Sequence, residues 1–339
     1  MKARVVFWGG VVIGTALLVW MLRAYGGAAI DVLGSDVSVP GLFAVGLAIF
    51  ATIACLSVRW RYLLAGLTLP PPFHVVALQR SAGHVLAVLI PSGKLGGDPL
   101  RAWLATRVGV SGGDAVASVA ADRTLETLAS APFSILFALL LLQHGIPELD
   151  RALITILIGT GVLFAAVVLV ARALHRGRGI ASELVRRIAP QPADGPGSGT
   201  AVIEAAERAA ATLLGRREQL GVAFAIGIVA NVLVILEFWA LLVAFGLPAD
   251  GLAIVAAIFA TGAAHALPIP AGIGALEGAQ VWLFGMLGHP VEVGLAVGLA
   301  VRCRELLWML PGLGYLLVTT LRASAERAAD ADADGAAAS

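Results

Sequence analysis

Charged residues are scarce in this sequence. Only 13% of its 339 residues are Asp, Glu, Lys or Arg, whereas 59% are hydrophobic and the mean hydropathy is +0.92. A soluble domain usually carries about 25% charged residues, so the composition excludes an ordinary soluble protein and indicates an integral membrane protein. The net charge of +1 gives no sign of a nucleic-acid partner, and we expect none.

Cysteine and the common catalytic motifs are nearly absent as well. The two cysteines, Cys55 and Cys303, both fall inside apolar segments, which argues against a disulfide framework and against a metal site. No Walker motif, cluster of metal ligands or Ser/His/Asp spacing stands out. We therefore expect no metal, no cofactor and no catalytic residue, and we interpret the chain as a protein other than an enzyme.

Long apolar runs are what the sequence has instead. The runs that reach the roughly 20 residues of a spanning helix are 5–22, 40–58, 115–142, 152–171, 220–243 and 293–318. The first run exceeds the apolar part of a signal peptide and no cleavage site follows it, so we expect an uncleaved first helix. The predicted fold class is all-α, a polytopic integral membrane protein with about six spanning helices.

The positions of Lys and Arg predict which helix ends lie in the cytosol. The markers of the cytosolic side are Lys2, Arg4, Arg59, Arg61 and the eight Arg of the loop 172–219. With these assignments the short apolar segment that begins at residue 73 must start and end on the same side. We therefore expect a re-entrant hairpin over 73–109, broken by "IPSGKLGGDPLRAW" at 90–103, and both termini in the cytosol.

The broken segment has a second copy. A shift of 179 residues, without a gap, aligns "IPSGKLGGDPLRAW" with "IPAGIGALEGAQVW". The matches that are rare in this composition are Pro91 with Pro270, Trp103 with Trp282, Arg123 with Arg302 and Glu126 with Glu305. Residues 244–301 contain no Lys or Arg whereas 59–114 contain six, so the second copy is expected to face the outside.

The repeat divides the chain into two halves of opposite orientation. The first half is 1–142 with its hairpin at 73–109, and the second is 152–321 with a matching hairpin at 252–288. The tail 322–339 is small and polar and is expected to be disordered. Inverted repeats that are broken by Gly and Pro at matching positions point to the binding site of a transporter, since irregular backbone at membrane depth must be buried or line a cavity.

The same residues carry a resemblance to a known family. "GGDPLRAWLATRVGVSGGDAVASVAADRTLE" and "PAGIGALEGAQVWLFGMLG", followed by "GLAVRCRELLWMLPGL", resemble the two signature regions of the lysylphosphatidylglycerol synthase transmembrane, or flippase-like, family. The GGD, D-R-T-L-E and R-E-L-L runs are most similar to its hopanoid-biosynthesis-associated branch. The resemblance covers roughly 40–320 and implies a multi-pass protein of the bacterial inner membrane that moves or handles lipids. The soluble aminoacyl-transferase domain of the parent enzyme has no counterpart here, so lipid aminoacylation is not implied.

Several charged residues fall inside the apolar segments, where such groups face the protein interior or a cavity. Arg123 and Glu126 share one helix face, and Arg302 and Glu305 repeat the spacing. These pairs are interpreted either as contacts for an anionic lipid headgroup, which the planar Arg fork suits, or as internally satisfied salt bridges that hold the two halves together. The further candidates for the headgroup path are Lys94, Arg101, Arg80 and His84.

Asp98 and Glu277 open the returning arms of the two hairpins. They are interpreted either as helix caps or as a proton or cation site. The candidates for a hairpin backbone that approaches a ligand closely are Pro91, Gly93, Gly96, Gly97, Pro270, Gly272 and Gly274. 

Glu237 is alone in its helix and is interpreted either as a proton-coupling carboxylate or, as we favour, as a partner of Arg123 or Arg302. Asp122 and Arg304 have no counterparts in the repeat and are expected to be peripheral, and His265 is expected to be structural.

The sequence thus predicts a lipid translocase whose substrate is a hopanoid or an anionic or polyisoprenoid lipid. One alternative is a membrane-embedded lipid-modifying enzyme, for which Asp98, Glu277 and His84 are the candidate groups. The other is a non-catalytic scaffold that binds lipid or hopanoid biosynthesis proteins through the loop 172–219. The sequence does not specify an oligomeric state.

Overall fold

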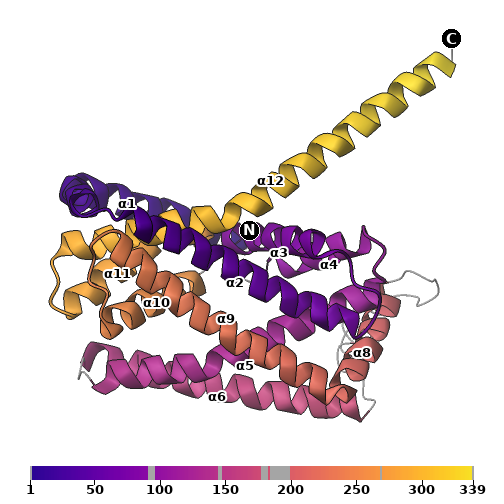
Figure 1. Ribbon diagram of the computed structural model, residues 1–339, viewed down its shortest axis with the longest axis horizontal. Helices are drawn as coiled ribbons and strands as arrows, with labels where there is room; N and C mark the ends of the chain where they lie inside the picture. The colour runs from indigo at the N-terminus through magenta and orange to yellow at the C-terminus, as the bar shows by residue number, and fades with distance from the viewer. Residues whose placement is uncertain are drawn as a thin grey trace.

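The computed structural model describes residues 2–90, 96–143, 147–176, 182–183, 199–267 and 269–337. Throughout these ranges the chain is helical and forms no strand (Figure 1). The helices are α1 (Lys2–Ser35), α2 (Val39–Ala65), α3 (Phe73–Leu89), α4 (Asp98–Thr106), α5 (Gly112–Gln143), α6 (Pro147–His175), α8 (Gly199–Gly215), α9 (Arg217–Ala244), α10 (Gly251–Ala266), the 3₁₀ turn η1 (Pro270–Gly272), α11 (Ala275–Met286) and α12 (Val291–Ala337).

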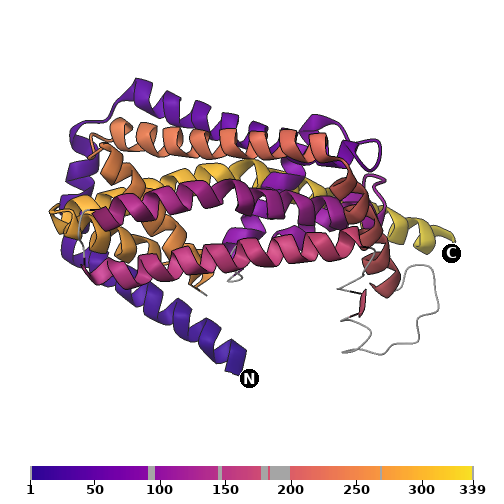
Figure 2. The ribbon, with the colours of Figure 1, turned by 90° about the horizontal axis from the view of Figure 1, so that it is seen from below.

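Five helices in the described ranges are long and apolar enough to cross a membrane. They are Val12–Ser35 within α1, Val39–Ala65, Gly112–Gln143, Leu153–Leu174 within α6, and Arg217–Ala244. Helices α2, α5, α6 and α9 lie side by side along one direction, as spanning helices in a bundle do (Figures 1 and 2). The protein is a polytopic, all-α membrane protein, which confirms the fold class predicted from composition.

The sixth predicted run, 293–318, lies inside α12. Its apolar character is interrupted by Arg302, Arg304 and Glu305, whose side chains are only 22%, 11% and 7% exposed. The helix therefore turns its charged positions toward the rest of the protein, as expected for charged groups in a membrane segment.

Two pairs of short helices occupy the segments predicted as hairpins. Helix α3 has 17 residues and α10 has 16, so each is about 25 Å long and shorter than the roughly 30 Å hydrocarbon core. Each is followed by an even shorter helix that contacts it, α4 after α3 and α11 after α10. Gly83 and Gly97 let the first pair approach closely, because a Cβ on Gly97 would fall on the Gly83 carbonyl oxygen.

Helices α2 and α9 occupy equivalent positions under the 179-residue shift, which moves 39–65 onto 218–244. They pack against each other in antiparallel fashion: Ser38 N donates to Ala244 O at 2.8 Å, and Gln219 Nε2 donates to Tyr62 O at 2.5 Å. The shift also relates α5 to α12 and α3 to α10, and the contacts between the halves follow this relation. Helix α12 contacts α1 and α3 of the first half, while α5 contacts α6 and α10 of the second half.

The two segments expected to lack helix differ from that prediction. Within 172–219, α8 packs against α5 and buries Ala206, Ala209 and Leu213, which recur at helical spacing. The density of Arg had suggested a loop, but it does not prevent an amphipathic helix. The tail is also helical as far as Ala337 and projects away from the bundle (Figure 1). Its many alanines have the highest helix propensity, which outweighs the polar composition.

The largest apolar core lies between α9, α10, α11 and α12. Helix α10 contributes a row of small buried residues, among them Ala253, Ala257, Ala260 and Ala264. Small side chains let neighbouring helices approach closely in a membrane protein. This packing holds α10 firmly against α11, and it fixes the position of His265 at the last turn of α10.

Candidate functional site

Asp122 of α5 is the centre of a buried ionic cluster. Its side chain is 0% exposed and accepts from Arg59 Nε at 2.7 Å, Arg80 Nη1 at 2.5 Å and Arg101 Nη2 at 2.7 Å. These three arginines come from α2, α3 and α4, so the carboxylate joins four helices. A buried carboxylate is tolerated only when it is paired and hydrogen-bonded, which the three guanidiniums achieve.

Two sequence interpretations are wrong at this point. Asp122 was expected to be peripheral because it has no counterpart in the repeat, but it is buried at the centre of the cluster. Arg59 was expected to follow the end of helix 40–58, but α2 continues to Ala65 and the Arg59 side chain is 0% exposed; the cytosolic side assigned to this helix end stays a prediction. Counting positive charges cannot distinguish an Arg in solvent from an Arg that has a buried partner.

Glu126 and Asp98 complete this cluster. Glu126 Oε2 accepts from Arg59 at 3.1 Å and from Arg80 at 3.0 Å, and its Oε1 accepts from Arg123 Nη1 at 3.1 Å. Arg123 also donates two hydrogen bonds to Asp98, at 2.9 and 3.2 Å. We call this group the arginine cluster; its members are Arg59, Arg80, Arg101, Arg123, Asp98, Asp122 and Glu126. Four guanidiniums against three carboxylates give it a formal charge of +1.

A second ionic group surrounds Arg302 of α12. Arg302 binds Glu277 Oε1 through Nε at 3.0 Å and Nη2 at 2.8 Å, and it binds Glu305 Oε2 at 3.0 Å. It also donates to the carbonyls of Ala271 at 2.6 Å and Gly272 at 3.3 Å. Arg302 therefore links α11 and α12 to the turn that follows α10.

The turn at 270–274 requires the glycines predicted for it. Gly272 and Gly274 have φ of +57° and +75°, the left-handed region that favours glycine. Gly274 also lies against the backbone of Gly14 in α1, where a Cβ would overlap the Gly14 carbonyl. Glu277 accepts from Gly274 N at 3.0 Å, so this carboxylate caps α11 and also pairs with an arginine.

Each half contains a copy of the same three-residue ionic unit. Asp98–Arg123–Glu126 and Glu277–Arg302–Glu305 have the same connections, with each member displaced by 179 residues. Each Arg pairs with acids of its own half. The salt bridges predicted within each pair are therefore present, and the acids that these two arginines bind here lie in the same half as the arginine.

Glu237 of α9 contacts the first half through Thr52, while its partners Arg304 and Trp308 belong to its own half. Its side chain is 0% exposed, forms an ion pair with Arg304, accepts from Trp308 Nε1 at 2.7 Å and lies 3.2 Å from Thr52 Oγ1 of α2. Glu237 is thus paired, as favoured from the sequence, but with Arg304 rather than with Arg123 or Arg302. The expectation that Arg304 is peripheral is also wrong.

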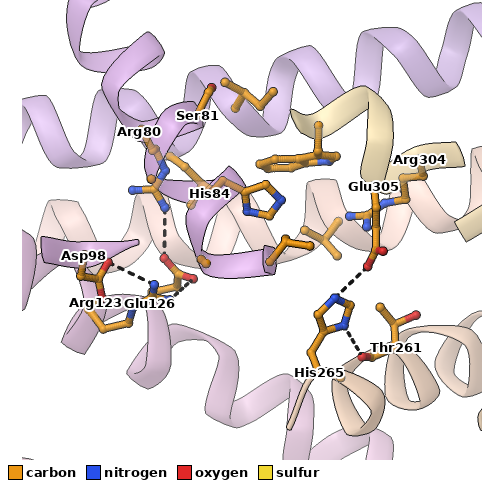
Figure 3. Close-up of a pocket in the computed structure, with 18 of the residues that line it drawn as sticks. Arg80, Ser81, His84, Asp98, Arg123, Glu126, Thr261, His265, Arg304 and Glu305 are labelled. Atoms are coloured by element: carbon orange, nitrogen blue, oxygen red, sulfur yellow. Dashed lines mark hydrogen bonds and ion pairs between the residues drawn. The ribbon is translucent and has the colours of Figure 1, made fainter. Parts of the chain in front are cut away.

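A cavity of about 290 Å³ lies between the arginine cluster and the second half. In Figure 3, Arg80, Asp98, Arg123 and Glu126 line one side, Thr261, His265, Arg304 and Glu305 line the other, and His84 lies between them. The imidazole of His84 packs against the Trp308 ring, with centroids 5.1 Å apart.

His265, which was expected to be structural, takes part in this wall. Its Nδ1 lies 2.8 Å from the Thr261 carbonyl oxygen, and its Nε2 lies 3.0 Å from Glu305 Oε1.

The predicted site residues divide into three groups. Those that line the cavity are Arg80, His84, Asp98, Arg101, Arg123, Glu126 and Glu305. Those behind it are Glu237, Glu277, Arg302, Pro270, Gly272 and Gly274, with Gly96 and Gly97 in the turn that begins α4. Those outside the described residues are Pro91, Gly93 and Lys94. Sequence reasoning missed Arg59, Asp122, Thr261, Arg304 and Trp308. For Arg59, Asp122 and Arg304 the signal available was a charged residue in an apolar helix; Thr261 and Trp308 carry no such signal.

The carboxylates of the site are occupied by guanidiniums rather than grouped as metal ligands. Among the residues that the structure describes, no set of three or more His, Cys, Asp or Glu lies close enough to hold a metal ion. The arrangement is instead one of fixed hydrogen-bond donors and acceptors around a polar cavity.

No curated protein matches the chain. A family model described as "Lysylphosphatidylglycerol synthase TM region" matches residues 7–312, a range that includes both ionic groups and the whole cavity wall. The protein therefore belongs to the lysylphosphatidylglycerol synthase TM region family.

Proposed function

We propose that this protein translocates a lipid across the membrane, with the headgroup passing through the cavity while the hydrocarbon tails stay in the bilayer. The observation that carries the proposal is the charged cavity of about 290 Å³ between helices of an otherwise apolar bundle. Charged groups inside a membrane protein are costly and mark substrate or ion pathways. Membership in a family whose members act on lipids agrees with a lipid as the substrate.

The wall formed by the arginine cluster suits an anionic headgroup. Arg80, Arg101 and Arg123 line the cavity there together with Asp98 and Glu126, while Asp122 is buried behind them. Arg guanidiniums bind phosphate oxygens in pairs. The most accessible members are Glu126 and Arg123, whose side chains are 34% and 25% exposed, so a phosphate is expected to meet this pair first.

The proposal includes two inverted halves. The antiparallel packing of α2 on α9 supports this arrangement, because the 179-residue shift relates these helices and antiparallel spanning helices have opposite orientations. The matching ionic units support it too. In such a transporter the substrate site lies at the interface of the repeats, and the cavity is lined from both halves.

The finer features of the proposal depend on the sequence. The distribution of Lys and Arg supports both termini in the cytosol, and the resemblance carried by the two signature regions supports a bacterial inner-membrane location. The GGD, D-R-T-L-E and R-E-L-L runs support a hopanoid, or an anionic or polyisoprenoid lipid, as the substrate, and lipid or hopanoid biosynthesis proteins as partners.

The test is leaflet exchange in vesicles that contain the purified protein and fluorescent phosphatidylglycerol, measured by quenching of the outer leaflet. We expect exchange with the wild-type protein and a loss of at least about tenfold in Arg123→Gln, since each charge-assisted hydrogen bond is worth about 1.5–3 kcal/mol. Arg107→Gln is the matched control, because Arg107 is exposed and packs on Trp103 instead of facing the cavity.

Exchange no faster than in protein-free vesicles, with anionic, zwitterionic and hopanoid lipids alike, would refute translocation. Mass spectrometry of the same vesicles separates the enzyme alternative, which requires a covalently altered lipid. A protein that neither exchanges nor alters lipids would favour the scaffold alternative.

A further inference from the structure

His265 and Glu305 form a titratable pair on the cavity wall, and the proposed function assigns no chemistry to this pair. His265 lies in the last turn of α10 and Glu305 lies on α12, at the side of the cavity opposite the arginine cluster (Figure 3). The side chains are 6% and 7% exposed, and Nε2 lies 3.0 Å from Oε1. The cavity is the side from which a small ion reaches them.

The hydrogen bond at the other ring nitrogen fixes the chemistry of this contact. Nδ1 of His265 lies 2.8 Å from the Thr261 carbonyl oxygen, and a carbonyl can only accept, so Nδ1 carries a hydrogen. In a neutral imidazole Nε2 then has a lone pair, which would face a carboxylate oxygen of Glu305 and repel it. The 3.0 Å contact is attractive only when one further proton lies between Nε2 and Oε1.

We propose that His265 and Glu305 are a one-proton binding site that couples lipid translocation to proton movement. This inference rests on the translocation proposed above. The proton enters from water in the cavity and is shared between Nε2 and Oε1; it leaves to water when the cavity faces the other side. Only N–H and O–H bonds form and break, and no group is oxidised or reduced.

Release of the proton should also move α10 relative to α12. Without it the imidazole and the carboxylate repel each other, so α10 and α12 must separate locally or admit a donor from the substrate. Glu305 Oε2 is held by Arg302, and Arg302 grips the carbonyls of Ala271 and Gly272. A movement of Glu305 is therefore transmitted to the turn that follows α10.

The His265–Glu305 pair is distinct from the ion pairs that surround it. The charged and titratable groups around it are Arg302 and Arg304 on α12, Glu277 on α11, Glu237 on α9, Arg123 and Glu126 on α5, and Arg80 and His84 on α3. Arg304 is engaged by Glu237, and Glu277 by Arg302. The position that matches His265 in the first half is Leu86, so the repeat supplies a carboxylate on both sides but a histidine on one.

The first experiment is the vesicle assay with fluorescent phosphatidylglycerol, run with and without an imposed pH gradient. For a step linked to one proton, the wild-type exchange rate should change by up to about tenfold per pH unit. In His265→Gln and Glu305→Gln exchange should respond less than about twofold, because neither variant can hold the shared proton. His74→Gln, an exposed histidine at the start of α3, should respond as the wild type does.

Wild-type exchange that ignores the gradient, or variants that respond as the wild type does, would overturn the coupling and leave translocation intact. A second readout needs neither a labelled lipid nor a variant. Vesicles of the wild-type protein loaded with a pH-sensitive dye should take up protons faster than protein-free vesicles when the outside is acidified. Equal uptake overturns the inference.

The third readout is the ¹⁵N NMR spectrum of histidine-labelled protein in lipid nanodiscs. The neutral form of His265 should be the Nδ1–H tautomer, because Nδ1 lies 2.8 Å from the Thr261 carbonyl oxygen. An Nε2–H tautomer would overturn the proton site even if no lipid exchange were observed.

Discussion

Replacing Asp122 by Asn removes the charge that three guanidiniums share. Arg59 and Arg101 are the most deeply buried of these, with side chains 0% and 4% exposed, and the Asp122 carboxylate is 0% exposed. The Asn side chain keeps one acceptor oxygen but directs an NH₂ group toward arginines that can only donate. Breaking a buried ion pair by removing one partner costs about 3–5 kcal/mol, and we expect a loss of unfolding free energy in that range.

The loss is measurable by titrating the purified protein from mild detergent into a denaturing detergent and following tryptophan fluorescence. Trp60 reports directly on this region, because its ring lies 4.4 Å below the Arg101 guanidinium and its Nε1 donates to Ser118 at 3.2 Å. Asp114→Asn is the matched control on the same helix. Asp114 makes an exposed hydrogen bond with Ser111 near the start of α5, so its loss should cost no more than about 1 kcal/mol.

A double-mutant cycle sharpens the result. Once Asp122 is neutral, the buried Arg101 keeps only the longer contact of 3.4 Å with Asp98, so Arg101→Gln should cost less in Asp122→Asn than in the wild-type protein, with a coupling of at least about 1 kcal/mol. The reasoning is refuted if Asp122→Asn costs no more than Asp114→Asn, or if the effects of the two substitutions simply add.

Further outcomes follow from single contacts. Gly97→Ala should lower the unfolding free energy strongly, because the new Cβ overlaps the Gly83 carbonyl. The control Gly46→Ala on α2 meets no neighbouring atom and should be neutral or slightly stabilising. Equal unfolding midpoints for the two variants would contradict the close packing of α3 on α4. Glu237→Gln should destabilise the protein by about 3–5 kcal/mol, since Arg304 loses its buried partner; a midpoint unchanged from wild type in the same titration would show that this pair does not hold α12 against α9. Single cysteines at Pro99, which is exposed, and at Gly278, its counterpart under the 179-residue shift, should be labelled by a membrane-impermeant reagent from opposite sides of the membrane, and labelling from one side would end the inverted arrangement.

The sequence allowed the fold class and one part of the site to be predicted. Apolar runs of spanning length gave the helices, because insertion in a membrane depends on local composition. Arg123 with Glu126 and Arg302 with Glu305 were found because an i, i+3 spacing fixes one helix face without tertiary information.

The partners of these groups could not be predicted in the same way. Asp122 has three partners from three other helices, and Arg304 meets Glu237 across 67 residues of chain. Such pairings depend on how helices pack, and the repeat gives no guidance where one half has no counterpart. Helix α8 was not predicted for another reason. A count of arginines indicates the side of the membrane and carries no information on secondary structure.

The most direct test of the translocation account is to fill the cavity. Ile258 of α10 lines it, so Ile258→Cys in a protein with Cys55→Ser and Cys303→Ser places one thiol in the proposed headgroup path. Lipid exchange should proceed before the thiol reacts with a bulky maleimide and stop afterwards, whereas the same label at Val222→Cys, on the exposed face of α9, should leave exchange unchanged. Exchange that continues at its full rate with the cavity thiol fully labelled would show that lipids do not cross through this cavity.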